Sequence, residues 1–196
     1  IMNDLKLVPG VLDVQVSYTL PLDSSSGNNV YLLDNGQENL FNIADQYSGS
    51  AGLFDMLEIP FIEGRYPQSP TEIAVSESFV EKMMEFRDWS DGAVGKQVYI
   101  TEHDDQIGAV TISGVYKDYR INTLTNQDTR ASIKFYGEVG KDHMPFMAIK
   151  VSEVTTDMMA KVEEVIQARI ENKDVVVKSY KDSMREAYSS ERRMRN

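Results

Sequence analysis

The last third of the chain places a helical pattern between two strand patterns, and this order constrains the fold most. Residues 146–152 and 174–180 predict strands, and residues 153–172 carry apolar side chains at helical spacing. A strand, a helix and a strand joined this tightly form a right-handed parallel crossover. Residues 143–180 therefore predict one βαβ unit. The apolar face of its helix consists of Val154, Met158, Val162, Val165, Ile166 and Ile170.

A second strand-rich region at the N-terminal end completes the predicted division of the chain. Residues 11–18 are rich in β-branched side chains, which favour strands, and they are free to pair beside the βαβ unit. We therefore predict an α+β fold. Residues 1–68 and 142–196 form one α/β subdomain from both chain ends, and residues 69–141 form a smaller, strand-rich insert.

Turn residues divide the middle of the chain into short elements. Asn35-Gly36 is a strong hairpin pair, and Ser76 is a good N-cap for the helical pattern that follows it. Residues 61–70 contain glycine and two prolines and predict a loop. The elements predicted for this region are strands at 29–34, 41–48, 72–76 and 131–139, helices at 51–59 and 76–86, and a hairpin at 96–116.

Both ends of the chain carry helical patterns without the usual boundary signals. Residues 1–8 lack a plausible N-cap residue at their start, and residues 183–196 contain no glycine or proline that would end a helix. We interpret the two patterns as connectors, and we expect them to leave the α/β body side by side.

Composition limits the partners and the chemistry of the chain. A formal net charge of -11 disfavours nucleic acid and anionic lipid surfaces, which are themselves polyanions. Arg192, Arg193 and Arg195 are a local exception, which we interpret as a solvated basic end. The chain contains no cysteine, so disulfides, thiolate nucleophiles and thiolate metal sites are excluded.

Few residues offer catalytic chemistry. His103 and His143 fall in predicted loops, outside any nucleophile-elbow pattern. The run from Glu102 to Asp105 carries metal-ligating atoms, but adjacent side chains of an exposed turn cannot all face one ion, so we interpret it as a solvated turn. The number of carboxylates in the chain does not by itself exclude a glycosidase-type pair. We assign no catalytic, cofactor-binding or metal-binding residue.

Residues 92–97 resemble a phosphate-binding loop in part, but they do not match its motif. Ser90 stands where the first glycine of that motif belongs, and Gln97 replaces its serine or threonine. A strand pattern, not a helix, follows Lys96. Any ATP on which the protein depends is therefore expected to be hydrolysed by another polypeptide.

Several short motifs follow one another in an order that is informative as a whole. They are Pro9-Gly10 after the first helical pattern, Gly64-Arg65 after a short helix, Trp89 followed by Gly95-Lys96, Gly114 and Asp118 in Gly-Val-Tyr-Lys-Asp, and Tyr188 followed by Glu191 and Arg192. In order and spacing they resemble the extracytoplasmic domain of FtsX-like permeases, the MacB type of ABC transporter. The resemblance spans nearly the whole chain.

The resemblance implies a porter-like subdomain built from both chain ends and an inserted Sabre-like subdomain. It implies a non-catalytic domain at the periplasmic face of the bacterial inner membrane, whose end helices continue as a stalk into the membrane. Tyr188, Glu191 and Arg192 would mark the junction with that stalk. The implied partners are a cytoplasmic ABC ATPase, a second permease in a homodimer or pair, and a periplasmic accessory protein, with no cofactor.

Two classes of function lead, and an enzyme ranks third. The leading hypothesis is a domain that couples cytoplasmic ATP hydrolysis to conformational change, substrate export or partner interaction outside the membrane. The alternative is a free-standing ligand-binding, peptide-binding or sensor domain, suggested by the loop-rich insert and by aromatic residues such as Tyr18, Tyr66 and Trp89.

Overall fold

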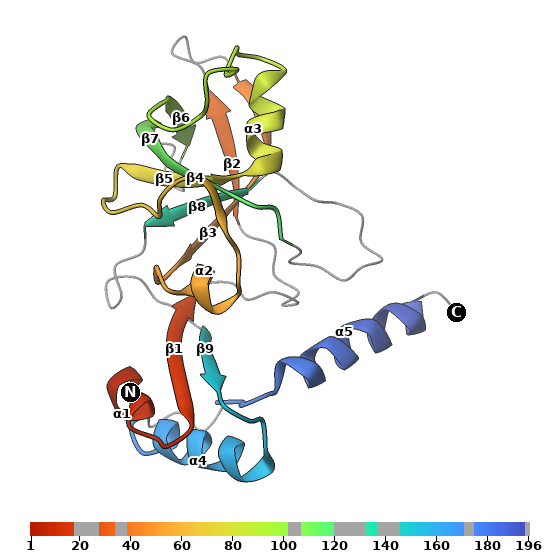
Figure 1. The fold of residues 1–196 in the computed structure, drawn as a ribbon. Coiled ribbons are helices and arrows are strands. Elements are labelled where there is room, and N and C mark those ends of the chain that lie inside the picture. Colours follow the sequence, from red (N-terminus) through yellow and green to blue (C-terminus); the bar gives the residue numbers. More distant parts are fainter. Residues whose placement is uncertain are drawn as a thin grey trace.

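The structure, a computed structural model, consists of an upper body, a lower body and one projecting helix (Figure 1). The upper body comprises the described residues between 28 and 136, and the lower body comprises residues 1–17, 146–170 and 175–179. The structure describes residues 1–17, 28–33, 39–101, 107–119, 132–136, 146–170 and 175–194.

The lower body packs two helices against a two-stranded ladder. β1 (Val11–Ser17) pairs antiparallel with β9 (Phe146–Val151). α1 (Met2–Lys6) contacts both β1 and α4 (Thr156–Gln167). The buried core of the lower body consists of Leu5, Val14, Val162 and Ile166.

The strands of the upper body form a ladder that closes on itself, because the last strand in the order pairs with the first. The order is β2 (Asn28–Leu33), β6 (Gln97–Thr101), β7 (Ile107–Tyr116), β5 (Glu72–Ser76), β8 (Ser132–Tyr136) and β3 (Asn39–Gly49), which returns to β2. The β5–β7 and β3–β8 pairings are parallel, and the others are antiparallel. β4 (Phe61–Gly64) adds to the edge of β7 beyond the end of β6.

Two helices and two apolar clusters complete the upper body. α3 (Glu77–Met84) buries Phe79 and Met83 against β5 and β7, and α2 (Leu53–Met56) buries Phe54 in an aromatic cluster with Phe61 and Tyr116. The hydroxyl of Ser76 accepts a hydrogen bond from the backbone nitrogen of Phe79 at 3.2 Å, which caps α3.

Most predicted elements are confirmed. The mixed α+β class is confirmed, as are the strands over 11–17 and 72–76, the cap at Ser76 and the β6–β7 hairpin. β2 and β3 pair around the predicted hairpin turn, whose residues 34–38 lie outside the described part of the chain.

The second strand of the predicted βαβ unit is wrong for the residues that the structure describes. Residues 175–179 belong to no strand, and α5 (Tyr180–Met194) begins directly after them. Val175 and Val177 pack against the lower-body core while Val176 is 70% exposed. The alternating pattern therefore reflects one-sided burial, which does not require a hydrogen-bonded neighbouring strand.

Two further predictions are corrected. The predicted loop 61–70 begins with β4, because glycines in β4 and β7 allow the two backbones to approach each other closely. Val154 does not join the apolar face of its helix: it is 61% exposed, since α4 is capped by Thr155 and begins only after it.

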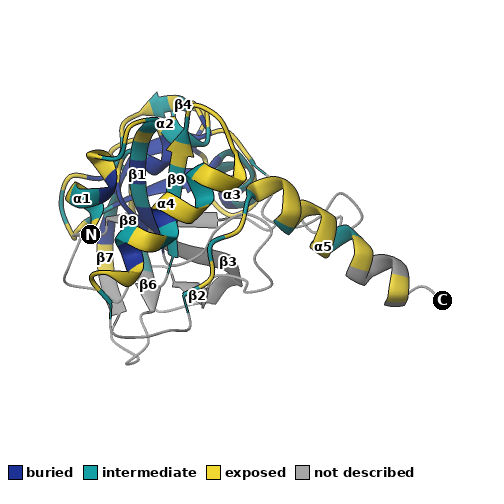
Figure 2. Ribbon diagram, turned by 90° about the horizontal axis from the view of Figure 1, so that it is seen from below, coloured by how far each residue is buried: buried dark blue, intermediate teal, exposed yellow. Residues whose placement is uncertain are grey.

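The two end helices do not leave the body side by side. Leu5 of α1 is fully buried, so α1 is part of the lower-body core. α5 projects away from both bodies, and no described side chain on it is buried (Figures 1 and 2). Among the described residues, no helix is both long and apolar enough to cross a membrane.

The division into residues 1–68 with 142–196 and an insert at 69–141 stays a prediction. In the described ladders, β2, β3 and β4 pair with β6, β8 and β7, respectively, so strands from before residue 68 hydrogen-bond to strands of the insert. None of the three apolar clusters of the described residues joins the upper body to the lower one.

Candidate functional site: motif residues around β7

β4 and β7 approach each other most closely where two motif glycines meet. Gly64 has φ of +67°, a left-handed conformation that favours glycine. A Cβ atom on Gly114 would lie 2.7 Å from the backbone nitrogen of Arg65. That nitrogen donates to the carbonyl of Ser113 at 2.9 Å, and the Ser113 hydroxyl donates back to the Arg65 carbonyl at 3.1 Å. The two glycines thus permit a reciprocal lock between β4 and β7.

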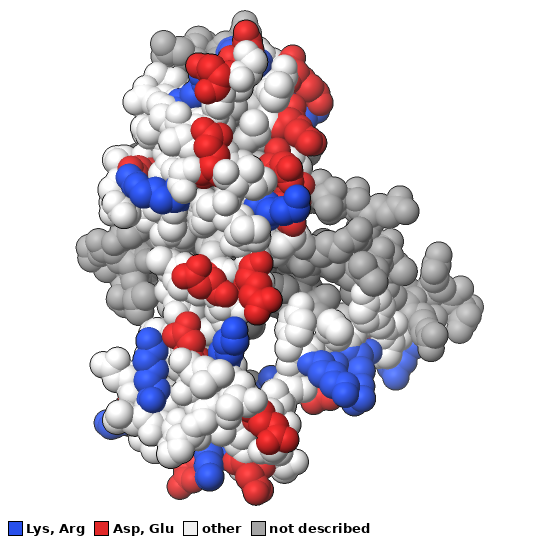
Figure 3. Space-filling model, in the orientation of Figure 1, with Lys and Arg blue, Asp and Glu red and all other residues white. Residues whose placement is uncertain are grey.

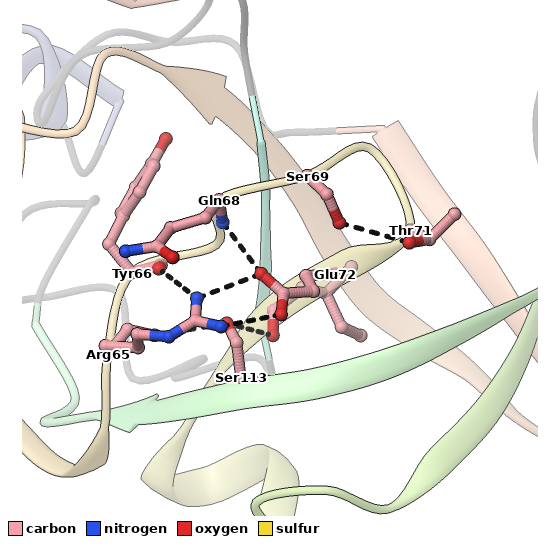
Figure 4. A network of polar contacts seen from close by, with 8 residues as sticks. Arg65, Tyr66, Gln68, Ser69, Thr71, Glu72 and Ser113 are labelled. Atoms are coloured by element: carbon pink, nitrogen blue, oxygen red, sulfur yellow. Dashed lines mark hydrogen bonds and ion pairs between the residues drawn. The ribbon is translucent and has the colours of Figure 1, made fainter.

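Arg65 continues from this lock into a two-pronged ion pair (Figure 4). Its Nη1 and Nη2 atoms donate to the two carboxylate oxygens of Glu72 at 2.9 and 2.7 Å, and Nη1 also donates to the Tyr66 carbonyl at 3.1 Å. The Gln68 backbone nitrogen donates to Glu72 at 2.8 Å. Hydrogen bonding by Arg65, more than any other contact, lowers the pKa of Glu72 to about 2. The pair fixes the path of the chain between β4 and β5.

The Trp89 to Lys96 segment reaches the same part of β7 from another side. Trp89 is buried in the upper-body core, and Gly95 has φ of +85°. The Gly95 backbone nitrogen donates to the carbonyl of Ile112 at 2.8 Å, and the Ile112 nitrogen donates to the carbonyl of Lys96 at 2.9 Å. Lys96 Nζ forms an ion pair with Asp91 at 2.7 Å, and hydrogen bonding by Lys96 is the main cause that lowers the pKa of Asp91.

Glu63 of β4 holds this segment beside the Gly-Arg turn. Its carboxylate accepts hydrogen bonds from the backbone nitrogens of Ala93, at 3.4 Å, and Val94, at 3.2 Å. The Gly64-Arg65, Gly95-Lys96 and Gly114 motifs therefore converge on three consecutive residues of β7, from Ile112 to Gly114.

Asp118 follows the end of β7 and contacts the start of α3. Its Oδ1 accepts from the backbone nitrogen of Ser78 at 3.1 Å and from the Ser78 hydroxyl at 3.0 Å. A carboxylate at a helix N-terminus is favoured by the helix dipole and by the unpaired backbone N–H groups there. Asp118 thus ties the end of β7 to α3.

Pro9-Gly10 lies in the lower body, apart from the other motifs. Gly10 has φ of +93°, and its carbonyl accepts from the backbone nitrogen of Ser152 at 2.8 Å. A Cβ atom there would press on the side chain of Met158 in α4. The Pro-Gly turn therefore brings the α1–β1 connection against the β9–α4 connection.

The predicted stalk-junction residues lie on α5. Tyr188 has a partly exposed side chain, and the side chains of Glu191 and Arg192 lie outside what the structure describes. At the base of α5, Lys178 and Glu186 form an ion pair of 2.7 Å. Figure 3 shows basic side chains along α5 and mainly acidic ones over the upper body.

Most residues considered for other chemistry lie outside the described part of the chain, namely His103, His143 and the run from Glu102 to Asp105. After Lys96 the chain enters β6, as predicted, so this segment lacks the helix of a phosphate-binding loop. Within the described residues, no group of three or more metal-ligating side chains is gathered.

The structure also reveals residues that the motifs did not indicate. Glu63, Glu72 and Ser113 hold the convergence on β7, yet none was singled out by the sequence analysis. Glu72 follows Arg65 by seven residues, but the pairing depends on the path of the intervening loop, which spacing alone does not define. The structure places the motif residues, and their functional role stays a prediction.

Comparison with solved structures finds permease domains of the same fold. The periplasmic region of MacB from Actinobacillus actinomycetemcomitans matches with a TM-score of 0.60 and 16% identity, over 100% of this chain and 81% of that chain. A domain of a protein described as a permease, from Porphyromonas gingivalis, matches with a TM-score of 0.57 and 17% identity, over 89% of this chain and 77% of that one.

Sequence comparison adds no further relative, since no family model and no curated protein matches. At these identities the likeness concerns the fold. The resemblance inferred from the order of the motifs is therefore confirmed at the level of fold, which is that of the MacB periplasmic region.

Proposed function

We propose that this chain is a non-catalytic extracytoplasmic domain of a MacB-type ABC-transporter permease. It would couple ATP hydrolysis by a cytoplasmic ABC ATPase to movement outside the membrane, and so to substrate export or to contact with an accessory protein. The observation that carries the proposal is the fold match to the MacB periplasmic region, which covers 100% of this chain.

The motif geometry supports a mechanical role. The upper body is cross-linked around β7 by the Arg65–Glu72 pair, by Glu63 and by the two close-packed glycines. We expect such a body to move as a unit when force is applied to one side, because close-packed protein interiors transmit strain. Rigid-body motion of domains is one of the common forms of conformational change in proteins.

In this proposal the domain stands at the periplasmic face of the inner membrane, next to a second permease copy. The membrane location can be tested with single cysteines, because the chain has none of its own. Glu81→Cys places a thiol on an exposed position of α3, and Ala93→Cys places one at a position that is 1% exposed.

The experiment uses the native gene product, with any cysteine outside residues 1–196 replaced by serine, in spheroplasts treated with a membrane-impermeant maleimide. We expect the protein in the inner-membrane fraction, with Glu81→Cys labelled from outside and Ala93→Cys labelled only after denaturation. The same variants in lysed spheroplasts provide the matched control. A native gene product that stays soluble, or a Glu81→Cys thiol that reacts only after lysis, would contradict the proposal.

Coupling is tested separately from location. The native permease would be purified with its cognate ATPase, and we expect the two to copurify and ATPase activity to change when the permease is reconstituted. The free-standing sensor function predicts instead that a small ligand or peptide stabilises the isolated domain in thermal unfolding. A soluble native product with ligand-dependent stabilisation would favour that alternative.

A further inference from the structure

In the described residues, the two bodies meet where β1 contacts β3 and α2, and at an exposed ion pair of 3.9 Å between Lys150 and Glu58. β1 and β3 share one paired position, Ser17 with Gly49, where the lower and upper ladders meet. None of the described apolar clusters crosses this boundary. Interfaces between domains that lack a large apolar contact permit relative motion by default.

Ser50 is the centre of this contact. It is 8% exposed, and its backbone nitrogen donates to the carbonyl of Val16 at 2.9 Å. Its hydroxyl oxygen accepts from the Val16 nitrogen at 3.0 Å, and the hydroxyl donates to Gln15 Oε1 at 2.6 Å. One side chain of the upper body thus binds both the backbone and a side chain of β1.

A polar chain leads from Ser50 back to α1. Gln15 Nε2 donates to Asp13 Oδ2 at 2.7 Å, which orients the amide so that its oxygen faces Ser50. The other Asp13 oxygen accepts from the Val14 nitrogen at 2.8 Å and lies 3.7 Å from Lys6 Nζ at the end of α1.

The backbone beside Ser50 fits the Gln15 side chain closely. A Cβ atom on Gly52 would collide with the Gln15 amide, so glycine leaves the space that this side chain fills. Gly52 immediately precedes α2, which contacts β1. The joint thus has a defined resting position, set by hydrogen bonds and by one close approach.

We propose that the Asp13–Gln15–Ser50 chain is a hinge that sets the angle between the lower and upper bodies and relays movement of α1 to the upper body. This inference rests on the proposed function for its purpose, since a domain that couples movement requires a joint with a preferred angle. The hinge itself is a property of the chain and is tested without a membrane.

The test measures distances between pairs of spin labels by pulsed electron paramagnetic resonance. The pair Glu81→Cys on α3 and Glu164→Cys on α4 measures a distance between the two bodies. The pair Glu81→Cys and Gln97→Cys on β6 measures a distance within the upper body. All three positions are exposed, and the chain contains no other cysteine. The readout is the ratio of the two distribution widths.

Ser50→Ala removes the hydroxyl that bonds both the Val16 backbone and the Gln15 side chain, and we expect it to raise this ratio about twofold, because no apolar cluster of the described residues spans the joint. Ser69→Ala is the matched control: it removes a hydroxyl that bonds Thr71 at 3.1 Å within the upper body, and the ratio should not change. An unchanged ratio in Ser50→Ala overturns the hinge.

Gly52→Ala gives a second, independent readout. The added methyl group displaces the Gln15 amide, so we expect the mean distance between the bodies to shift while the distance within the upper body stays constant. An unshifted mean contradicts the role of Gln15. The two proposals can fail separately. A joint that proves rigid does not change the membrane location of the native protein. A native protein that proves soluble does not change the distances between the bodies.

Discussion

The upper and lower bodies achieve order by different means. The upper body closes a ladder of strands on itself and locks it by backbone contacts at Gly64 and Gly114. The lower body relies on two strands and two helices around a core of four buried side chains. A closed ladder leaves few unpaired strand edges, whereas a two-stranded ladder depends on the helices that cover it. The upper body should therefore be the more stable unit, and the lower body the part that yields.

The largest expected effect tests the lock of the upper body. Gly114→Ala places a methyl group against the backbone of Arg65, which cannot move aside as a side chain can, and we expect a loss of about 4 kcal/mol in the free energy of unfolding. Denaturant titration measures it. Gly95→Ala is the matched control: a Cβ atom there meets nothing within 4 Å, so only its φ of +85° costs about 1 kcal/mol. Equal losses for the two variants would refute the lock.

The next effect tests whether the bodies unfold separately. Leu5 is fully buried, and Leu5→Ala should destabilise the lower body by about 3 kcal/mol through a lost apolar contact and a cavity. Amide exchange should accelerate in β1 and β9 and stay unchanged in β5 and β7, because the cores are separate. Leu7→Ala, at an 81% exposed position, is the control and should change neither. Acceleration in both bodies would mean one cooperative unit.

A smaller effect concerns charge. The Glu72 carboxylate has a pKa near 2, below its ordinary value of 4.5, because Arg65 hydrogen-bonds to its charged form. The stability that this pair gives is present above pH 4.5 and is lost as the pH falls through about 2. Glu72→Gln should cost about 1 kcal/mol at neutral pH, after solvent screening, and the difference from the native chain should vanish in strong acid.

The lower body offers a matched pair for this measurement. Asp4 lies 3.1 Å from Arg169 in an exposed pair of the same charge type. Arg169→Gln, which removes this pair and leaves the other contacts of Asp4 in place, should produce no measurable change in unfolding, because exposed single-pronged pairs add little. Equal losses of unfolding free energy for the two substitutions would show that the two-pronged geometry at Arg65 adds no stability beyond that of an ordinary exposed ion pair.

Local patterns predicted the elements, and long-range contacts explain the errors. Ser76 was predicted as a cap because its partner, the Phe79 nitrogen, lies three residues away. β4 was predicted as a loop because its strand character depends on Gly114, fifty residues later in the chain than Gly64. The strand predicted at 174–180 failed because alternation reports burial on one side, which residues 175–179 have without a ladder partner.

In the candidate site, too, local sequence signals were predictive and long-range contacts were not. The motifs indicated Gly64, Arg65, Gly95 and Gly114 as a set, but not that they converge on β7. Glu72, Glu63 and Ser113 were missed, because a side chain that pairs across strands leaves no periodic signal in its own segment. Ser50 of the hinge lies within a run of five small residues, Ser48 to Gly52, and such a run gives no signal about its partner across the two bodies.

The smallest expected effect compares the N-cap residues of two helices, one in each body. The Ser76 hydroxyl accepts from Phe79 at the start of α3, and the Thr155 hydroxyl accepts from Met158 at 3.1 Å at the start of α4. Alanine at either position should cost about 1 kcal/mol, because one helix N–H group loses its acceptor. Amide exchange should assign each loss to its own body, and Thr155→Ser, which keeps the hydroxyl, should restore α4. A cap variant in α4 that accelerates exchange in β5 would contradict separate unfolding of the two bodies, as the same result for Leu5→Ala would.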